Sequence, residues 1–222
     1  MSKFKVVLFD FDGTFVDSGE GILNCVEYAL EKHNIPVGDR SRLNYFIGPP
    51  LYTSFTDLYG IEGEDCENIV ETYRERYASK GVFECALYDG IIDVVKSLKE
   101  NGIKVGIASA KPEIFIYQMI ELFKVEGLFD TIAGRDLENH DDDKTGILLK
   151  SMSNLGIKNE EDKVKVAMVG DRHYDITGAK NAGVTSVGVT YGYGTEQELV
   201  DAGADFIAHN MEELNKILLN ND

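Results

Sequence analysis

The sequence lacks any long apolar run, and this absence excludes a membrane-spanning helix. It also lacks a charged, apolar and then small-residue segment at its start, and the first apolar run begins almost at once after Met1. We therefore expect no secretory leader. Only 3 cysteines are present, Cys25, Cys66 and Cys85, and their spacing is not that of a metal site. We expect reduced thiols and a cytoplasmic location.

Basic residues are also scarce. The chain has 22 lysines and arginines against 39 aspartates and glutamates, which gives a net charge of −17. Because binding to a nucleic-acid backbone needs clustered lysine and arginine, this composition argues against a nucleic-acid polymer as partner. A small phosphorylated metabolite remains compatible, provided that a metal ion or a placed lysine supplies positive charge locally.

The stretch KVVLFDFDGTFVDS begins with an apolar run, residues 6–9, that suits a strand buried on both faces. Asp10 and Asp12 follow it two residues apart, so their side chains point the same way if the strand persists. Gly13 then permits a sharp turn, which leaves both acids at the carboxyl end of the strand. Ligands bind at that end in open α/β sheets, although a strand followed by an ordinary acidic turn is the alternative.

Residues 19 to about 85 show helical spacing and no convincing strand. The 222 residues, 43% of them hydrophobic, suffice for one core and a smaller appended domain. We therefore predict an all-helical cap domain over residues 17–85, with hinges near 15–18 and 83–88. Its helices are expected from Ser18 to just before Asn34, over 41–46, from Leu51 to Leu58 after the breaker Gly48-Pro49-Pro50, and over 64–79.

After Leu87 the pattern changes to strands that alternate with helices. This alternation predicts a parallel sheet covered on both faces by helices, to which the first strand also belongs. The fold class is therefore α/β, with a core domain made of residues 1–16 and 86–222. Further strands are expected over 104–108, 131–133, 165–169, 186–189 and 206–208, and helices up to 101 and over 112–123, 144–154, 175–182, 196–202 and from 211.

A hydroxyl-bearing residue follows one of these strands. Ser109 comes directly after the strand expected over 104–108, and Lys111 and Pro112 come next. A hydroxyl followed by backbone N–H groups at a helix start can hold an anion. An ordinary helix cap is the alternative, and the residues alone favour it.

A second pair of acids follows the strand expected over 165–169. Gly170 permits close backbone approach there, and Asp171 and Asp175 lie four residues apart across a turn. Asp175 can simply cap the next helix. However, four acids at two strand ends would repel one another without a cation, and oxygen ligands of this kind suit Mg²⁺.

The positive charge that such a site needs is expected from Lys144, at the start of a helix after the acidic triplet 141–143. A cation at a helix start opposes the helix dipole and needs local compensation. We interpret the triplet as a solvated loop rather than a metal site. Lys144 is the candidate for neutralising both an attacking carboxylate and a phosphate.

In chain order these features resemble the four motifs of the haloacid dehalogenase superfamily. The motifs are DFDGT at Asp10–Thr14, Ser109 after a strand, Lys144, and GDRHYD at Gly170–Asp175. The match resembles the phosphatase branch with a helical cap after the first motif. Many relatives place proline directly after the lysine, whereas Thr145 follows here, so nearby Lys150 is the alternative to Lys144.

Shorter segments are similar to the phosphoglycolate-phosphatase-like 5′-nucleotidase group. The resemblance implies a Rossmann-like three-layer α/β/α core and a Mg²⁺-dependent phosphatase acting on a small phosphomonoester, such as phosphoglycolate or a nucleoside monophosphate, through an aspartyl-phosphate. The segments that carry this likeness are Gly48–Leu51, Ser109–Pro112 and Gly170–Arg172.

The resemblance also implies a role for each residue. Asp10 is the nucleophile, and Asp12 protonates the leaving oxygen and then activates water. Ser109 and Lys144 complete the catalytic set by binding phosphoryl oxygens. The implied metal ligands are Asp10, Asp12 through its backbone carbonyl, Asp171 and Asp175, and the implied substrate-binding residues are Gly48 and Lys111.

Two other functions stay open. A phosphomutase similar to β-phosphoglucomutase uses the same pair of acids to move phosphate between sugar hydroxyls. A non-catalytic phosphate-binding regulatory protein would keep the fold alone. Asp12 favours phosphoryl transfer over dehalogenation, because the dehalogenases of this superfamily lack the second acid. No feature of the sequence indicates an oligomeric state.

Overall fold

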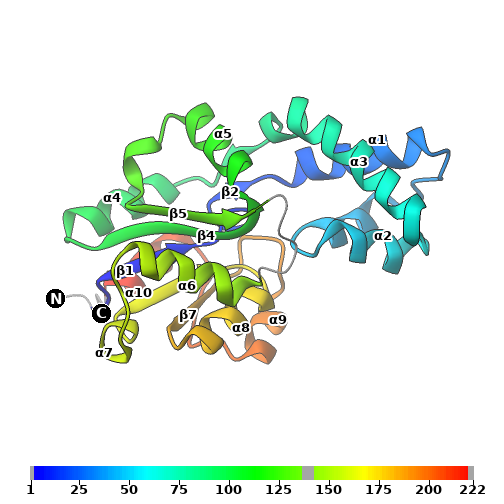
Figure 1. Cartoon of the computed structure of the whole chain (residues 1–222). Coiled ribbons are helices and arrows are strands. Elements are labelled where there is room, and N and C mark those ends of the chain that lie inside the picture. Colours follow the sequence, from blue (N-terminus) through cyan, green and yellow to red (C-terminus); the bar gives the residue numbers. More distant parts are fainter. Residues whose placement is uncertain (1–2, 137–142, 220–222) are drawn as a thin grey trace. The chain divides into compact units, whose positions relative to one another are not determined.

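The computed structural model describes residues 3–136 and 143–219 (Figure 1). The chain forms two compact units. Met1–Val16 and Leu87–Asp222 make up the first, which we call the α/β unit. Asp17–Ala86 make up the second, which we call the helical insert. No helix within the described ranges is both long and apolar enough to cross a membrane.

The α/β unit is built on a six-stranded sheet with the order β5-β4-β1-β6-β7-β8. All five pairings between neighbouring strands are parallel, which confirms the predicted parallel sheet. The strands are β1 (Val6–Phe9), β4 (Lys104–Pro112), β5 (Thr131–Arg135), β6 (Val166–Gly170), β7 (Thr185–Val189) and β8 (Phe206–Ala208).

Strand β1 lies at the centre of this sheet, and its apolar sequence explains why. Val6 and Leu8 pack with residues of α6 and α8 in one hydrophobic cluster. Val7 and Phe9 point the opposite way along the strand and are also buried, so β1 is covered on both faces. Phe9 pairs with Ile107 of β4 and Val169 of β6, which brings the carboxyl ends of three strands together.

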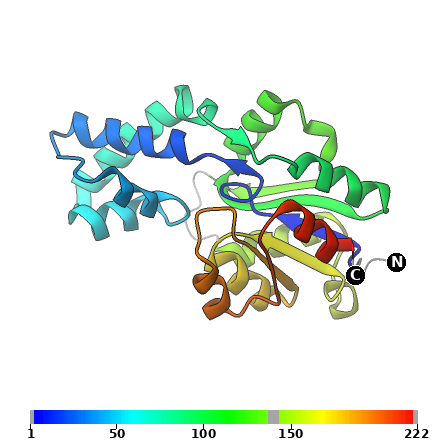
Figure 2. The same ribbon diagram turned by 180° about the vertical axis from the view of Figure 1, so that it is seen from behind.

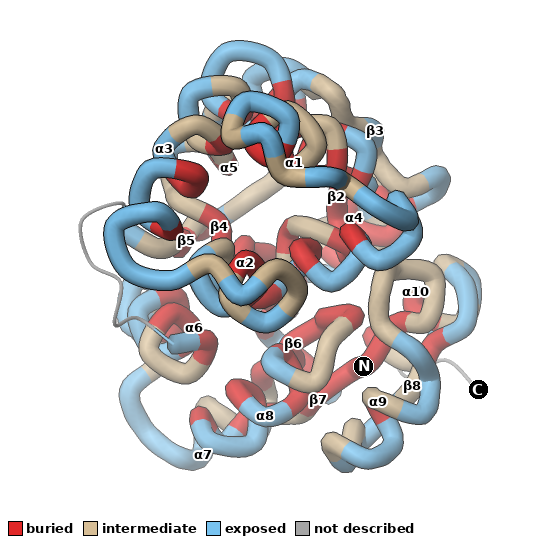
Figure 3. The backbone as a smooth tube through the Cα atoms, turned by 90° about the vertical axis from the view of Figure 1, so that its right-hand side faces the viewer, coloured by how far each residue is buried: buried red, intermediate tan, exposed pale blue. Residues whose placement is uncertain are grey.

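Helices cover both faces of the sheet (Figures 1 and 2). Helices α6 and α8 pack against each other, as do α4 and α10. Buried and exposed residues alternate along the helices, as expected when one side of each faces the core (Figure 3). The helices are α4 (Ile91–Glu100), α5 (Glu113–Phe123), α6 (Lys144–Asn154), α7 (Glu160–Lys163), α8 (His173–Ala182), α9 (Glu196–Ala202) and α10 (Met211–Leu219), with a 3-10 turn η3 at Glu126–Leu128.

The helical insert contains the helices that the sequence predicts. Helix α1 packs against α3 and also against η2, where a Cβ on Gly21 of α1 would strike the carbonyl of Gly81. A bidentate ion pair between Arg76 and Glu84 joins the end of α3 to the returning chain. The elements are α1 (Gly19–Lys32), η1 (Arg40–Phe46), α2 (Leu51–Tyr59), α3 (Gly63–Ser79) and η2 (Gly81–Phe83).

The structure contains two short strands that the sequence did not predict. β2 (Val16–Asp17) and β3 (Ala86–Leu87) pair in a two-stranded sheet, at the positions where hinges were predicted. Strands of two residues are too short to show the alternation by which strands are recognised in a sequence. The chain passes from one unit to the other within β2 and at β3.

Strand β4 corrects one prediction about Ser109. The strand extends to Pro112 instead of ending at residue 108, and α5 starts only at Glu113. Pairing with β5 resumes at Pro112 after a register shift that begins at Ala108. Ser109 and Lys111 therefore lie in a bulged part of the strand. Ser109 does not cap α5, so the interpretation of this residue as a helix cap was wrong, whereas the helix starts one residue after the predicted Pro112.

The starts of α8 and α6 bear on two further predictions. Helix α8 begins at His173, two residues earlier than predicted, and the carboxylate of Asp175 accepts the backbone N–H of Arg172 at its start. In the acidic triplet, Asp143 caps α6 by accepting the N–H of Gly146 at 2.8 Å. Residues 141 and 142 lie outside the described residues.

Candidate active site

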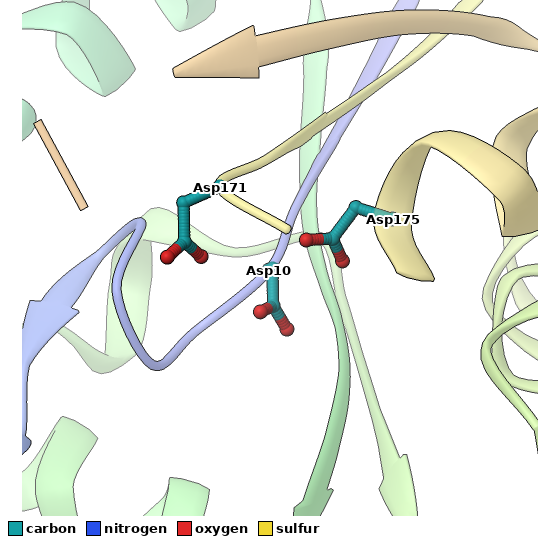
Figure 4. Close-up of side chains that lie close together, drawn as sticks. All are labelled: Asp10, Asp171 and Asp175. Atoms are coloured by element: carbon teal, nitrogen blue, oxygen red, sulfur yellow. The ribbon is translucent and has the colours of Figure 1, made fainter. Parts of the chain in front are cut away.

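Three carboxylates meet at the carboxyl ends of β1 and β6. Asp10 follows β1, Asp171 follows β6, and Asp175 lies in the first turn of α8. One oxygen of each lies within 4.8 Å of an oxygen of the others. Figure 4 shows Asp10 between the other two side chains. The structure thus brings together three of the four residues that were predicted to bind metal.

Asp171 is fully buried, and both of its oxygens accept hydrogen bonds. Oδ1 accepts from the hydroxyl of Thr14 at 3.2 Å, and Oδ2 accepts from the backbone N–H of Tyr193 at 2.8 Å. Burial, followed by the negative charges of Asp175 and Asp10, raises the pKa of Asp171 to about 8. In the absence of a cation, a charged Asp171 is therefore unfavourable.

Asp175 has two roles in the structure. Its Oδ2 accepts the backbone N–H of Arg172 at 3.1 Å, which caps α8, and its Oδ1 pairs with Lys144 Nζ at 2.7 Å. Burial raises the pKa of Asp175 to about 6, even though the positive charge of Lys144 acts in the opposite direction. Capping and membership of the acidic cluster are thus compatible, as the sequence allowed.

Lys144 lies between two of the three acids. Its Nζ is 2.6 Å from Asp10 Oδ1 as well as 2.7 Å from Asp175 Oδ1, and its side chain is only 7% exposed. Burial acts to lower the pKa of Lys144, but the charges of Asp10 and Asp175 outweigh it and raise the pKa. These two carboxylates supply the compensation that a cation at the start of a helix needs.

The alternative lysine lies elsewhere. Lys150 Nζ pairs with Glu113 at 3.1 Å, and its side chain is 49% exposed. The geometry therefore favours Lys144, which contacts both Asp10 and Asp175, over Lys150 as the lysine of the site.

The acidic cluster fits a divalent cation. Asp10, Asp171 and Asp175 offer carboxylate oxygens, which are the ligands that Mg²⁺ prefers. Lys144 can neutralise only part of the charge of three carboxylates, and like charges this close repel one another. The charge balance and the chemistry of the ligand set both suit Mg²⁺.

Asp12 lies beside a second buried lysine. Lys111 Nζ is 2.9 Å from Asp12 Oδ1 and 3.0 Å from Oδ2, and the two side chains are 4% and 18% exposed. The sequence predicted Lys111 as a substrate contact and did not predict this pair. The two residues are 99 positions apart in the sequence, but Asp12 follows β1 and Lys111 lies in β4, and these two strands are neighbours in the sheet.

The remaining predicted residues have different surroundings. Ser109 is buried, and its Oγ accepts the backbone N–H of Lys111 at 3.3 Å, within the bulge of β4. Gly48 belongs to the helical insert, where it is exposed between η1 and α2 with φ of 113°. Its predicted role in substrate binding stays a prediction.

Two groups of supporting residues were missed. One comprises Thr14 and the segment 191–194 after β7, which contact Asp171. The other is Glu198, which accepts from Arg172 Nε at 2.9 Å and from the backbone N–H of His173 at 3.0 Å. The repeated Tyr-Gly pattern of residues 191–194, directly after a strand, was the available signal for the first group.

Glu198 differs from the site carboxylates in its electrostatics. Burial acts to raise its pKa, but hydrogen bonds from His173 and Arg172 outweigh burial and lower the pKa of Glu198 to about 2. Glu198 is therefore a stable carboxylate that holds the turn after β6.

Known proteins are similar to this chain over most of its length. The family model for haloacid dehalogenase-like hydrolases matches residues 7–189. The chain is 34% identical over 197 residues to a 5′-nucleotidase of Pseudomonas aeruginosa, covering 89% of this chain and 87% of that protein. It is 32% identical over 212 residues to the pyrophosphatase PpaX of Halalkalibacterium halodurans, covering 96% and 95% respectively.

A solved structure agrees with these likenesses. A protein from Clostridium acetobutylicum, described as a predicted phosphatase, has a TM-score of 0.90 to this chain at 41% identity. The match covers 98% of this chain and 99% of that one. The similarity therefore includes both the α/β unit and the helical insert.

Proposed function

This chain belongs to the haloacid dehalogenase-like hydrolase family, and on that premise we propose that it is a Mg²⁺-dependent phosphatase that acts through an aspartyl-phosphate on Asp10. Its relatives support a hydrolase that acts on small phosphate substrates. The observation that carries the mechanism is the buried contact of 2.6 Å between Lys144 Nζ and the Asp10 carboxylate. It places positive charge where a negative nucleophile must approach a negative phosphate.

In the first step, a carboxylate oxygen of Asp10 attacks phosphorus in line with the leaving oxygen. The bond between phosphorus and the leaving oxygen breaks, and Asp12 donates a proton to that oxygen. Lys111, which contacts both oxygens of Asp12, holds this side chain in place.

In the second step, Asp12 accepts a proton from a water molecule. The water oxygen attacks phosphorus, the bond between phosphorus and Asp10 breaks, and inorganic phosphate leaves. The proton taken from water restores Asp12 for the next turnover. Ser109 and Lys144 bind phosphoryl oxygens in both steps, and Lys144 reduces the repulsion between Asp10 and the incoming phosphate.

The carboxylates of Asp10, Asp171 and Asp175 would hold Mg²⁺, together with the backbone carbonyl of Asp12. When bound, Mg²⁺ supplies positive charge that stabilises the phosphoryl oxygens during transfer. Asp171 and Asp175 have raised pKa values in its absence, which is the behaviour expected of acids arranged for a cation.

The substrate class follows from the relatives. The 5′-nucleotidase and the pyrophosphatase support nucleoside monophosphates and pyrophosphate as the first compounds to test, and the sequence motifs add phosphoglycolate. Gly48 and Lys111 are the residues that we propose for contacts with the substrate.

Phosphate release from these compounds, from sugar phosphates and from p-nitrophenyl phosphate tests the proposal. Protein stripped of metal by a chelator should be inactive, and excess Mg²⁺ should restore phosphate release. Activity that ignores both chelator and Mg²⁺ would remove the metal from the scheme. Conversion of a sugar phosphate to its isomer without release of phosphate would identify a phosphomutase instead. Binding of phosphate compounds without turnover would identify a regulatory protein.

A further inference from the structure

The loop of residues 191–194, between β7 and α9, contacts the acidic site at several points. We call it the brace loop. The backbone N–H of Tyr193 donates to Asp171 Oδ2 at 2.8 Å. This hydrogen bond fixes one oxygen of the buried carboxylate from a segment that carries none of the motif residues.

The brace loop reaches the other oxygen of Asp171 through Thr14. The hydroxyl of Tyr191 donates to the backbone carbonyl of Thr14 at 3.0 Å. The side chain of Thr14 in turn donates to Asp171 Oδ1 at 3.2 Å. Tyr191 thus holds the turn after β1 at the place where that turn meets Asp171, and its ring packs on Tyr88 with centroids 4.9 Å apart.

The glycines of the loop are required for space. A Cβ on Gly192 would lie 2.6 Å from Asp171 Oδ2 and would also strike the carbonyl of Gly13. A Cβ on Gly194 would strike the backbone carbonyl of Asp171. Neither glycine has a positive φ, so the limit at both positions is contact with the site and not backbone conformation.

We propose that the brace loop positions the Asp171 carboxylate for a divalent cation, with Tyr191 and Gly192 as positioning residues. The two hydrogen bonds take one acceptor site on each oxygen of Asp171 and fix the plane of the carboxylate. Each oxygen keeps further acceptor capacity, and one oxygen of Asp171 lies within 4.8 Å of oxygens of Asp10 and Asp175. This inference rests on the metal site of the proposed function, but it assigns the control of metal affinity to residues outside the four motifs.

The test is direct binding of Mn²⁺ and Mg²⁺ to the full chain, measured by calorimetry on metal-free protein. Tyr191→Phe removes only the hydroxyl and keeps the ring. Loss of this partly buried hydrogen bond to Thr14 should weaken metal affinity about fivefold. Gly192→Ala pushes a methyl group against Asp171 and should weaken it about tenfold or more.

Matched controls separate this effect from general destabilisation. Tyr59→Phe removes a tyrosine hydroxyl that donates to the carbonyl of Val37 at 2.9 Å in the helical insert. Gly127→Ala adds a methyl group where nothing lies within 4 Å. Both controls should bind metal as the unaltered chain does, and Tyr59→Phe should lower the unfolding temperature about as much as Tyr191→Phe.

The outcomes are distinct. Unchanged metal affinity in both Tyr191→Phe and Gly192→Ala would overturn the inference, as would equal weakening in Tyr59→Phe or an unaltered chain that binds neither cation. Weakened affinity in the two loop variants alone would support it. If the unaltered chain bound metal and the two loop variants alone bound it more weakly, but no compound released phosphate, the proposed phosphatase would fail. The role of the brace loop in positioning Asp171 would stand.

Discussion

The α/β unit and the helical insert bury different kinds of polar group. Within the described residues, the buried charged side chains are Lys111, Lys144, Asp171 and Asp175, and all four belong to the α/β unit. The insert buries charge-free polar side chains instead, at Ser18 and Ser54.

Ion pairs of the insert stay partly in contact with solvent. Arg76, which pairs with Glu84, is 16% exposed, and Arg40, which contacts Glu27, is 45% exposed. Removing an ion from water costs several kcal/mol unless it is paired and hydrogen-bonded. Charges are therefore buried where the proposed chemistry uses them, whereas the charges of the insert contribute to its stability.

The largest effect that this contrast predicts is the fall in turnover when the nucleophile is removed. Asp10→Asn keeps the size of the side chain and removes the attacking carboxylate, so phosphate release should fall by at least about 10⁴-fold. Asp93→Asn, on the exposed side of α4, is the matched control and should keep normal activity. Ordinary turnover by Asp10→Asn would contradict the assignment of the nucleophile.

The second prediction compares a buried lysine with an exposed one on the same helix. Lys144→Met should lower turnover at least about a hundredfold, because charge at the reacting centre is lost. It should also lower the free energy of unfolding by about 3 kcal/mol, since buried carboxylates lose their partner. Lys150→Met removes an exposed pair and should change the free energy of unfolding by less than about 1 kcal/mol. A crippled Lys150→Met beside an active Lys144→Met would reverse the assignment.

The third prediction concerns the insert. Arg76→Met removes two charged hydrogen bonds to Glu84 and a contact of 3.1 Å with Cys25 Sγ. The free energy of unfolding in urea should fall by about 2 kcal/mol. Arg40→Met should cost less than about 1 kcal/mol, because its pairs are exposed.

The turnover of the two arginine variants tests whether charges of the insert take part in the chemistry. At a temperature where the folded state is fully populated, both arginine variants should retain the kcat of the unaltered chain. A hundredfold loss of kcat in a folded Arg76→Met protein would show that the insert also holds charge for chemistry.

The smallest effect is expected at Glu198, a carboxylate of the α/β unit outside the acidic cluster. Its pKa of about 2 in the folded protein lies below the value of about 4.3 expected in an unfolded chain. The stabilisation by Glu198 is therefore complete above about pH 4.3 and is lost as the pH falls toward 2.

The difference in free energy of unfolding between the unaltered chain and Glu198→Gln measures this contribution. It should be about 1 kcal/mol at pH 7, because the side chain is partly exposed, and smaller at pH 3.5. A difference that stays constant between these pH values would show that the charge of Glu198 does not stabilise the fold.

The features of the fold that were predictable have local signals. The buried apolar run of β1 and the alternation of strands with helices after Leu87 predicted the parallel sheet. Asp10 and Asp171 could be placed together because each follows a strand and parallel strands end at the same edge. Asp175 followed from its spacing to Asp171.

Other features depend on contacts that no local pattern encodes. The extension of β4 to Pro112 requires the register with β5. The pairing of Lys111 with Asp12 requires the order of strands in the sheet and the bulge that follows Ala108. The contacts of Tyr191 with Thr14 join segments 177 positions apart. Such pairings are set by the packing of the complete fold, so sequence periodicity cannot predict them.

Chemical trapping of the phosphorylated intermediate tests the central claim most directly. The protein is mixed with Mg²⁺ and a substrate that releases phosphate, quenched with acid, and reduced with borohydride, which converts an aspartyl-phosphate to homoserine. Mass spectrometry of the peptides then locates the modified residue. The account predicts homoserine at Asp10 and at no other aspartate. An unmodified Asp10, or homoserine at Asp171 instead, would contradict it.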